Sequence, residues 1–155
     1  MTMHPKIQLR PSWDQYFLDI ADIVSSRSKD PRTKVGAVLV RERRIIGTGY
    51  NGFPKYVNEN IDARWEVPEK YIWVAHAERN AIDMCARDGV ATKGATLFVT
   101  LPPCNECAKS IIQCEIDKVV IGNPAPAHWQ NNVNIAESML KEAAIIIELA
   151  FSTDL

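Results

Sequence analysis

The sequence has no long hydrophobic run. None of its apolar stretches is long enough to cross a bilayer, and the first fifteen residues hold no apolar segment typical of a secretory signal. We therefore expect no membrane partner and a cytoplasmic location. Cysteine is scarce as well, with 4 residues. In a reducing compartment these favour metal ligands or buried free thiols over disulfides.

An excess of charge of one sign is also missing. The chain carries 18 Lys and Arg against 19 Asp and Glu, a net charge of −1. No overall field attracts a nucleic-acid backbone, so we expect no nucleic-acid partner. Internal repeats and low-complexity segments are absent too. The length of 155 residues predicts one domain over residues 1–155, in which about residues 1–11 form a loose segment.

Histidine is scarce, yet one of the 3 stands in a distinctive motif, His76-Ala77-Glu78. The motif is followed later by Pro103-Cys104-Asn105-Glu106-Cys107. Imidazole nitrogen and thiolate sulfur suit zinc, and three protein ligands leave a position for water, as in catalytic zinc sites. No other His or Cys obviously completes a structural set of four. We predict one zinc ion per chain, bound by His76, Cys104 and Cys107.

Glu78 lies two residues after the histidine and is placed to handle the protons of a metal-bound water. The pattern H-x-E followed by P-C-x-x-C is the known signature of zinc-dependent nucleobase deaminases. The alternative is a thioredoxin-like redox Cys-x-x-Cys with an unrelated His-x-Glu. We prefer the zinc interpretation, because both motifs fall where helices are predicted to begin after strands.

The hydrophobic pattern predicts an α/β fold. Ser12 begins the first helix, with Gln15 completing a capping box. An apolar stripe on this helix is expected in the core: Trp13, Tyr16, Phe17, Ile20, Ile23 and Val24. The remaining elements are a hairpin of strands 35–40 and 45–50, a long connection 55–71, a helix from the His motif to Gly89, a strand 95–101, a helix from Cys104, a strand 119–121, a helix from 133 and a strand 145–150.

Helices separate the last three predicted strands, so these strands should run parallel through right-handed crossovers, with the hairpin as an antiparallel element. Both metal-binding motifs start helices, and the ligands should therefore gather at one end of the sheet. The partial positive charge of a helix N-terminus favours the thiolate forms of Cys104 and Cys107.

Beyond the zinc motifs, the sequence resembles the deoxycytidylate (dCMP) deaminases over roughly residues 12–122. The matching stretches are Arg27-Ser28-Lys29-Asp30-Pro31, Lys34-Val35-Gly36-Ala37-Val38, Gly49-Tyr50-Asn51-Gly52-Phe53-Pro54, Lys70-Tyr71, His76-Ala77-Glu78-Arg79-Asn80-Ala81-Ile82 and Pro103-Cys104-Asn105-Glu106-Cys107-Ala108-Lys109. The resemblance implies a three-layer α-β-α cytidine-deaminase-like fold with a mixed five-stranded sheet. It also implies hydrolysis of dCMP to dUMP and ammonia by zinc-bound hydroxide, with Glu78 as the proton shuttle.

The resemblance assigns further residues to the substrate. Asn51 would bind the sugar and base region, and the backbone of Ala77 would help to hold the pyrimidine. Arg32 and Lys29 are candidates for the nucleotide phosphate, and their spacing is equally compatible with a solvated surface. The family further implies a homo-oligomer, dimer or hexamer, and regulation of some members by dCTP and dTTP near the Tyr-Asn-Gly loop.

Three departures from the family separate this chain from some members. The segment from Gly52 to Ala75 lacks the Cys and His that bind a second zinc in some members. Where the family often has a tyrosine near the substrate phosphate, a loop over residues 123–129 contains His128 and Trp129. The Ala-Gly that usually precedes the last strand is replaced by Ala143-Ala144. We expect His128 on the surface, while Trp129 either caps the pocket or packs.

Two alternatives remain beside dCMP deamination. One is the same chemistry on another small substrate, such as dCTP, a nucleoside or an aminopurine. The other is a zinc-stabilised binding module without turnover. Glu78 argues against the second, because a structural zinc site has no use for a carboxylate that is not a ligand.

Overall fold

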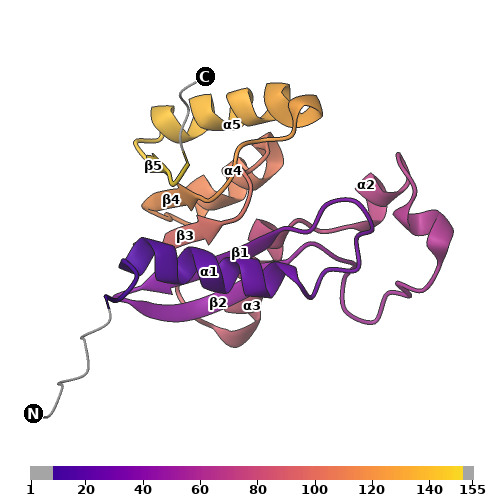
Figure 1. Ribbon diagram of the computed structural model, residues 1–155, viewed down its shortest axis with the longest axis horizontal. Coiled ribbons are helices and arrows are strands. Elements are labelled where there is room, and N and C mark those ends of the chain that lie inside the picture. Colours follow the sequence, from indigo (N-terminus) through magenta and orange to yellow (C-terminus); the bar gives the residue numbers. More distant parts are fainter. Residues whose placement is uncertain (1–8, 152–155) are drawn as a thin grey trace, which may run out of the picture.

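The computed structural model describes residues 9–151, in which a five-stranded mixed sheet lies between two layers of helices (Figure 1). The strand order is β2-β1-β3-β4-β5. Their bounds are β1 Gly36–Arg41, β2 Arg44–Tyr50, β3 Thr96–Val99, β4 Lys118–Ile121 and β5 Ile146–Leu149. β1 runs antiparallel to both β2 and β3, whereas β3, β4 and β5 are parallel. The predicted α-β-α fold with its mixed five-stranded sheet is confirmed.

The helices alternate with the parallel strands, as predicted. Their bounds in the described chain are α1 Trp13–Ser25, α2 Lys70–Trp73, α3 Ala77–Asp88, α4 Asn105–Gln113 and α5 Gln130–Glu142, with short 3-10 turns at Asp62–Trp65 and Ala127–Trp129. α5 begins three residues before the predicted start. Gly89 ends α3 in the left-handed region with φ 67°, which glycine adopts without a Cβ clash.

Strand β1, which lies between β2 and β3, contributes to the core on both faces of the sheet. Ala37 and Leu39 belong to the cluster shared with α3, α4 and α5, and Val38 and Val40 to the cluster beneath α1. Successive side chains of a strand point to opposite faces, so this unbroken apolar run is buried on both. The sheet is therefore a rigid support for the helices that begin at its edge.

Two predictions about the first helix were partly wrong: its capping box and its buried face. Ser12 does cap it, accepting a hydrogen bond from Gln15 N at 3.1 Å, but the Gln15 side chain donates to Asp19, so only half of the capping box forms. The predicted core stripe was wrong for three residues, since Trp13, Tyr16 and Ile23 are 48%, 44% and 73% exposed. The apolar arc of the helix is wider than its contact with the sheet, which buries Phe17, Leu18 and Ala21.

The long connection between β2 and α3 extends to one side of the sheet (Figure 1). It is held by its own aromatic contacts, with Phe53 stacked on Trp65 at 4.6 Å and Arg64 over the ring of Trp73 at 3.9 Å.

Within residues 9–151 no helix is long and apolar enough to span a membrane. The predicted loose segment falls mainly on residues 1–8, outside the described chain, and the single domain over 1–155 stays a prediction.

Candidate active site

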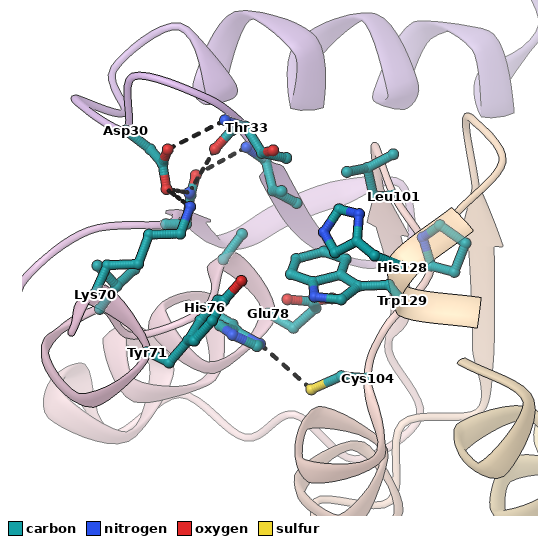
Figure 2. Close-up of a pocket in the computed structure, with 15 residues that line it drawn as sticks. Asp30, Thr33, Lys70, Tyr71, His76, Glu78, Leu101, Cys104, His128 and Trp129 are labelled. Atoms are coloured by element: carbon teal, nitrogen blue, oxygen red, sulfur yellow. Dashed lines mark hydrogen bonds and ion pairs between the residues drawn. The ribbon is translucent and has the colours of Figure 1, made fainter. Parts of the chain in front are cut away.

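Both metal-binding motifs sit at helix N-termini, as the sequence predicts. His76 is the N-cap residue of α3, and Cys104 is the N-cap residue of α4. Neither side chain caps its own helix; instead the two meet, with Cys104 Sγ 3.3 Å from His76 Nδ1 (Figure 2). Cys107, in the first turn of α4, places its Sγ 3.4 Å from the same nitrogen.

The geometry of these three atoms fits zinc. All three lie within 4.8 Å of one another. Around a tetrahedral zinc with its usual bond lengths, a nitrogen and a sulfur ligand are separated by about 3.6 Å. The observed separations are close to that value. Among the described residues, His76, Cys104 and Cys107 form the only such group of potential ligands, which leaves one tetrahedral position for water or substrate.

The charges of the ligands suit metal binding. The pKa of Cys104 is lowered to about 4, first by the hydrogen bond from the Cys107 thiol and then by that from His76. The pKa of Cys107 is raised, because its proton is shared with Cys104 and because it is buried. The pair therefore holds one thiolate readily, and the second proton leaves when a metal takes its place.

Glu78 lies beside the metal group without belonging to it. The residue is 4% exposed, and its Oε2 lies 3.7 Å from Cys107 Sγ. Burial raises the pKa of Glu78 to about 6, against the opposing charge of His76. A carboxyl group with such a pKa can both accept and release a proton near neutral pH, as general acid–base catalysis requires.

The N-terminus of α3 is positioned by contacts with the end of β2. Gly52 and Ala75 form a two-way backbone bridge with N···O distances of 3.1 and 2.9 Å. The Asn80 side chain donates to the carbonyl oxygen of Tyr50 at 2.8 Å. α3 also lies directly on β2, because β2 presents glycine at the contact. These contacts fix where His76 and Glu78 point.

A pocket opens over the metal group and contains two of the predicted substrate residues. Asn51, 7% exposed, and Ala77, fully buried, both line it. The Asn51 amide is turned into the protein: its Oδ1 accepts from Val35 N at 2.8 Å, and its Nδ2 donates to Thr33 O at 2.8 Å. Its contact with a ligand stays a prediction.

The predicted phosphate residues lie outside the lining of this pocket. The Lys29 ammonium pairs with Glu59 at 2.8 Å and its side chain is 54% exposed. Arg32 is exposed, and its backbone N–H, not its guanidinium, donates to Asp30 at 2.9 Å. Both residues flank the turn that forms one wall of the pocket, and their contact with a phosphate remains untested.

Sequence analysis missed a buried ion pair in the same wall. Lys70 Nζ lies 3.0 Å from Asp30 Oδ2, and both residues line the pocket (Figure 2). Burial would raise the pKa of Asp30, but hydrogen bonds from Arg32 N–H, the Lys70 ammonium and Thr33 N–H hold it below its usual value. Both residues stand in stretches that match the family, Asp30 in the stretch that ends at Pro31 and Lys70 in Lys70-Tyr71, but the match gave neither of them a role.

The other wall comes from the loop before α5. His128 is exposed, as expected, and it lines the pocket together with Trp129 (Figure 2). The Trp129 ring lies 6.0 Å from the His76 ring between centroids, so this side chain borders the pocket beside the metal group.

The chain thus combines an α-β-α fold with a three-ligand zinc site and a buried carboxyl group, which together define a zinc-dependent hydrolytic deaminase. The family model for the cytidine and deoxycytidylate deaminase zinc-binding region matches residues 11–123. The chain belongs to this family, and zinc is the metal of the site.

Named relatives agree with this assignment. An uncharacterised deaminase in the luxG 3′ region of Aliivibrio fischeri is 36% identical over 136 residues, which are 86% of this chain and 90% of that protein. Human deoxycytidylate deaminase is 41% identical over 114 residues, 70% of this chain and 63% of the human protein. The chain thus spans less than two thirds of the human enzyme. The dCMP deaminase of cyanophage S-TIM5, solved with dCMP and dUMP, superposes with a TM-score of 0.75 at 26% identity, covering 92% and 99% of the two chains.

Proposed function

We propose that this protein hydrolyses the exocyclic amine of a cytosine nucleotide, converting dCMP to dUMP and ammonia. The observation that carries the proposal is the position of Glu78, a buried carboxyl group beside the His76, Cys104 and Cys107 group but not part of it. The relatives named deoxycytidylate deaminase support the choice of dCMP.

The residues have distinct roles in this reaction. Zinc, when bound, lowers the pKa of a water in its open position toward about 7 and so supplies the nucleophile. Glu78 takes a proton from the attacking water, passes it to the ring nitrogen and later delivers a proton to the leaving amine. A carbon–oxygen bond forms at the ring carbon, the carbon–nitrogen bond breaks, and one water is consumed for each ammonia released.

Substrate binding is assigned as the resemblance implies. Asn51 contacts the sugar and base region, with one lone pair of its Oδ1 still available, and the Ala77 backbone holds the pyrimidine. Arg32 and Lys29 supply outer contacts to the phosphate. Their place beside the turn at Asp30, which lines the pocket, supports this assignment. A cytoplasmic location and a homo-oligomer, dimer or hexamer, also stay predictions, and sedimentation velocity measures the latter.

The test is a substrate screen with the zinc-loaded protein. Cytosine and adenine nucleosides with zero, one or three phosphates are incubated, and ammonia release and the ultraviolet spectrum are followed. We expect the highest kcat/KM with dCMP. A clear preference for dCTP, a nucleoside or an aminopurine would reassign the substrate. Ammonia release from none of them would instead support a binding module.

A further inference from the structure

Lys70 is the cation of a buried ion pair in the wall of the pocket. Among the described residues that line the pocket it is the only lysine or arginine, and it is 9% exposed. Its ammonium lies 3.0 Å from Asp30 Oδ2 and 5.8 Å from the centroid of the Tyr71 ring. The ammonium is therefore held in place by a buried partner, in a wall of the pocket.

The carboxylate of Asp30 is fully occupied. Its Oδ1 accepts from Arg32 N at 2.9 Å and Thr33 N at 3.1 Å, and its Oδ2 accepts from Lys70 and, at 3.5 Å, from Asn51 Nδ2. A carboxylate offers about four lone-pair sites, so none is left for a ligand. Asp30 thus acts on the pocket through Lys70, whose position it sets.

The Lys70 ammonium, in contrast, has N–H groups that are not used by Asp30. An ammonium carries three N–H groups, and Asp30 is the one hydrogen-bond acceptor it has between residues 9 and 151. The neighbouring Asn51 amide has none free, since its Nδ2 donates to Thr33 O and Asp30 Oδ2. Lys70 supplies the charged donors of this wall, beside the neutral hydroxyl groups of Thr33 and Tyr71.

The type of ligand follows from the charge. Burying an ammonium group costs free energy. If the ligand group at this wall were a sugar hydroxyl, a neutral amide or hydroxyl side chain could bind it with a smaller desolvation cost. A buried lysine with free N–H groups is instead suited to an anion, and phosphate oxygens form strong charge-assisted hydrogen bonds with lysine.

We propose that Lys70 determines specificity for a phosphorylated ligand: its ammonium donates to the phosphomonoester of the nucleotide, and Asp30 is its positioning residue. The inference rests on the proposed function, because the phosphate belongs to a nucleotide whose base lies at the zinc site. Arg32 and Lys29, outside the lining, act further from the pocket than Lys70.

The experiment separates binding from turnover. Calorimetric titration of the zinc-loaded protein with dUMP and with deoxyuridine measures the contribution of the phosphate to affinity. Lys70→Met should weaken dUMP binding about 10- to 100-fold, the equivalent of one charge-assisted hydrogen bond, and leave deoxyuridine binding unchanged. Lys93→Met is the matched control, because Lys93 also forms an ion pair, with Glu115 at 3.3 Å, but lines neither this pocket nor the adjoining one that shares His76 and Trp129 with it.

A second variant tests whether any loss of dUMP binding comes from misfolding. Lys70→Met leaves the buried Asp30 charge unpaired, whereas the double variant Asp30→Asn/Lys70→Gln keeps polar groups at both positions without a net buried charge. It should lose the same preference for dUMP while retaining zinc and the wild-type circular dichroism spectrum.

Each outcome is decisive. Equal losses for dUMP and deoxyuridine, or no loss, would overturn the role of Lys70, as would a wild-type protein that binds both ligands equally. If dUMP binds in a Lys70-dependent manner but dCMP releases no ammonia, the proposed function fails and the phosphate site stands.

Discussion

The backbone of Gly49 lies directly against the first turn of α3, so that a Cβ atom on Gly49 would come within 2.2 Å of the Ala77 carbonyl oxygen. The neighbouring Gly47 makes a similar contact, with 2.9 Å between a Cβ and the Ala81 carbonyl oxygen. At Gly49 only backbone atoms of the helix meet the strand, whereas at Gly47 the Cys85 side chain also lies at the contact, with its Sγ 2.7 Å from such a Cβ. Because Ala77 stands between His76 and Glu78, the packing of β2 sets the position of both.

Gly49→Ala should therefore damage the fold and the metal site together. Backbone atoms cannot yield as side chains do, and we expect a loss of about 2–4 kcal/mol in the free energy of unfolding, with weaker zinc binding. Urea unfolding and competition with a zinc chelator measure the two effects. Gly52→Ala is the control, because its Cβ would meet nothing closer than 3.6 Å. Similar behaviour of the two variants would contradict the proposed contact.

Removing one ligand should abolish tight zinc binding. Cys104→Ala takes away the thiol whose pKa is lowered to about 4, and two ligands do not hold zinc firmly. Metal analysis after dialysis should find one zinc per wild-type chain and almost none in the variant, together with a lower melting temperature. Cys114→Ala should retain zinc, because Cys114 is a free, half-buried thiol outside the metal group. Two zinc ions per wild-type chain would refute the site.

Glu78→Gln separates proton transfer from metal binding. The carboxyl group is not in the ligand set, so zinc content and fold should be retained. Turnover should fall by at least about 10²–10⁴-fold, the usual contribution of a general acid–base group. Steady-state kinetics on dCMP with a parallel zinc determination tests this. Near-normal activity in the variant would remove Glu78 from the mechanism.

Arg32→Ala tests the outer phosphate contact. If the guanidinium binds phosphate, kcat/KM for dCMP should drop roughly 10- to 150-fold, from about 1.5–3 kcal/mol for a charge-assisted hydrogen bond. Deoxycytidine, which lacks the phosphate, should react as before. Lys34→Ala, an exposed cation in the same segment, serves as the control. A matching decline on both substrates would assign Arg32 to the fold instead.

The Asp30–Lys70 pair should make stability sensitive to acid. The pKa of Asp30 is lowered in the folded protein, so its ionised form stabilises the fold above the unfolded pKa of about 3.9, and this contribution is lost as the pH falls through the lower folded value. The difference in unfolding free energy between wild type and Asp30→Asn should stay constant from about pH 7 to 5 and shrink below about pH 4. Urea unfolding across this range measures it. A difference that grows at low pH would contradict the depressed pKa.

Local signals in the sequence determined the order of elements and the identity of the metal ligands. The apolar runs of β1 and β3, the hairpin formed by β1 and β2 and the stop at Gly89 depend on neighbouring residues, and these predictions are confirmed. The H-x-E and P-C-x-x-C motifs are equally local. We predicted their meeting from helices that both follow strands. In the structure α4 follows β3, whereas α3 follows α2 and the long connection, and the three ligand atoms do lie together.

Only the tertiary structure decided which helix face is buried and how the pocket wall is built. Trp13 and Tyr16 share an apolar arc with Phe17, but the contact between α1 and the sheet does not cover all of it, and no local pattern records that limit. Asp30 and Lys70 are 40 residues apart and belong to segments without hydrophobic periodicity. Their pairing depends on the return of the chain from the long connection to the turn after α1, so the cation that enters the pocket becomes visible only in the folded chain.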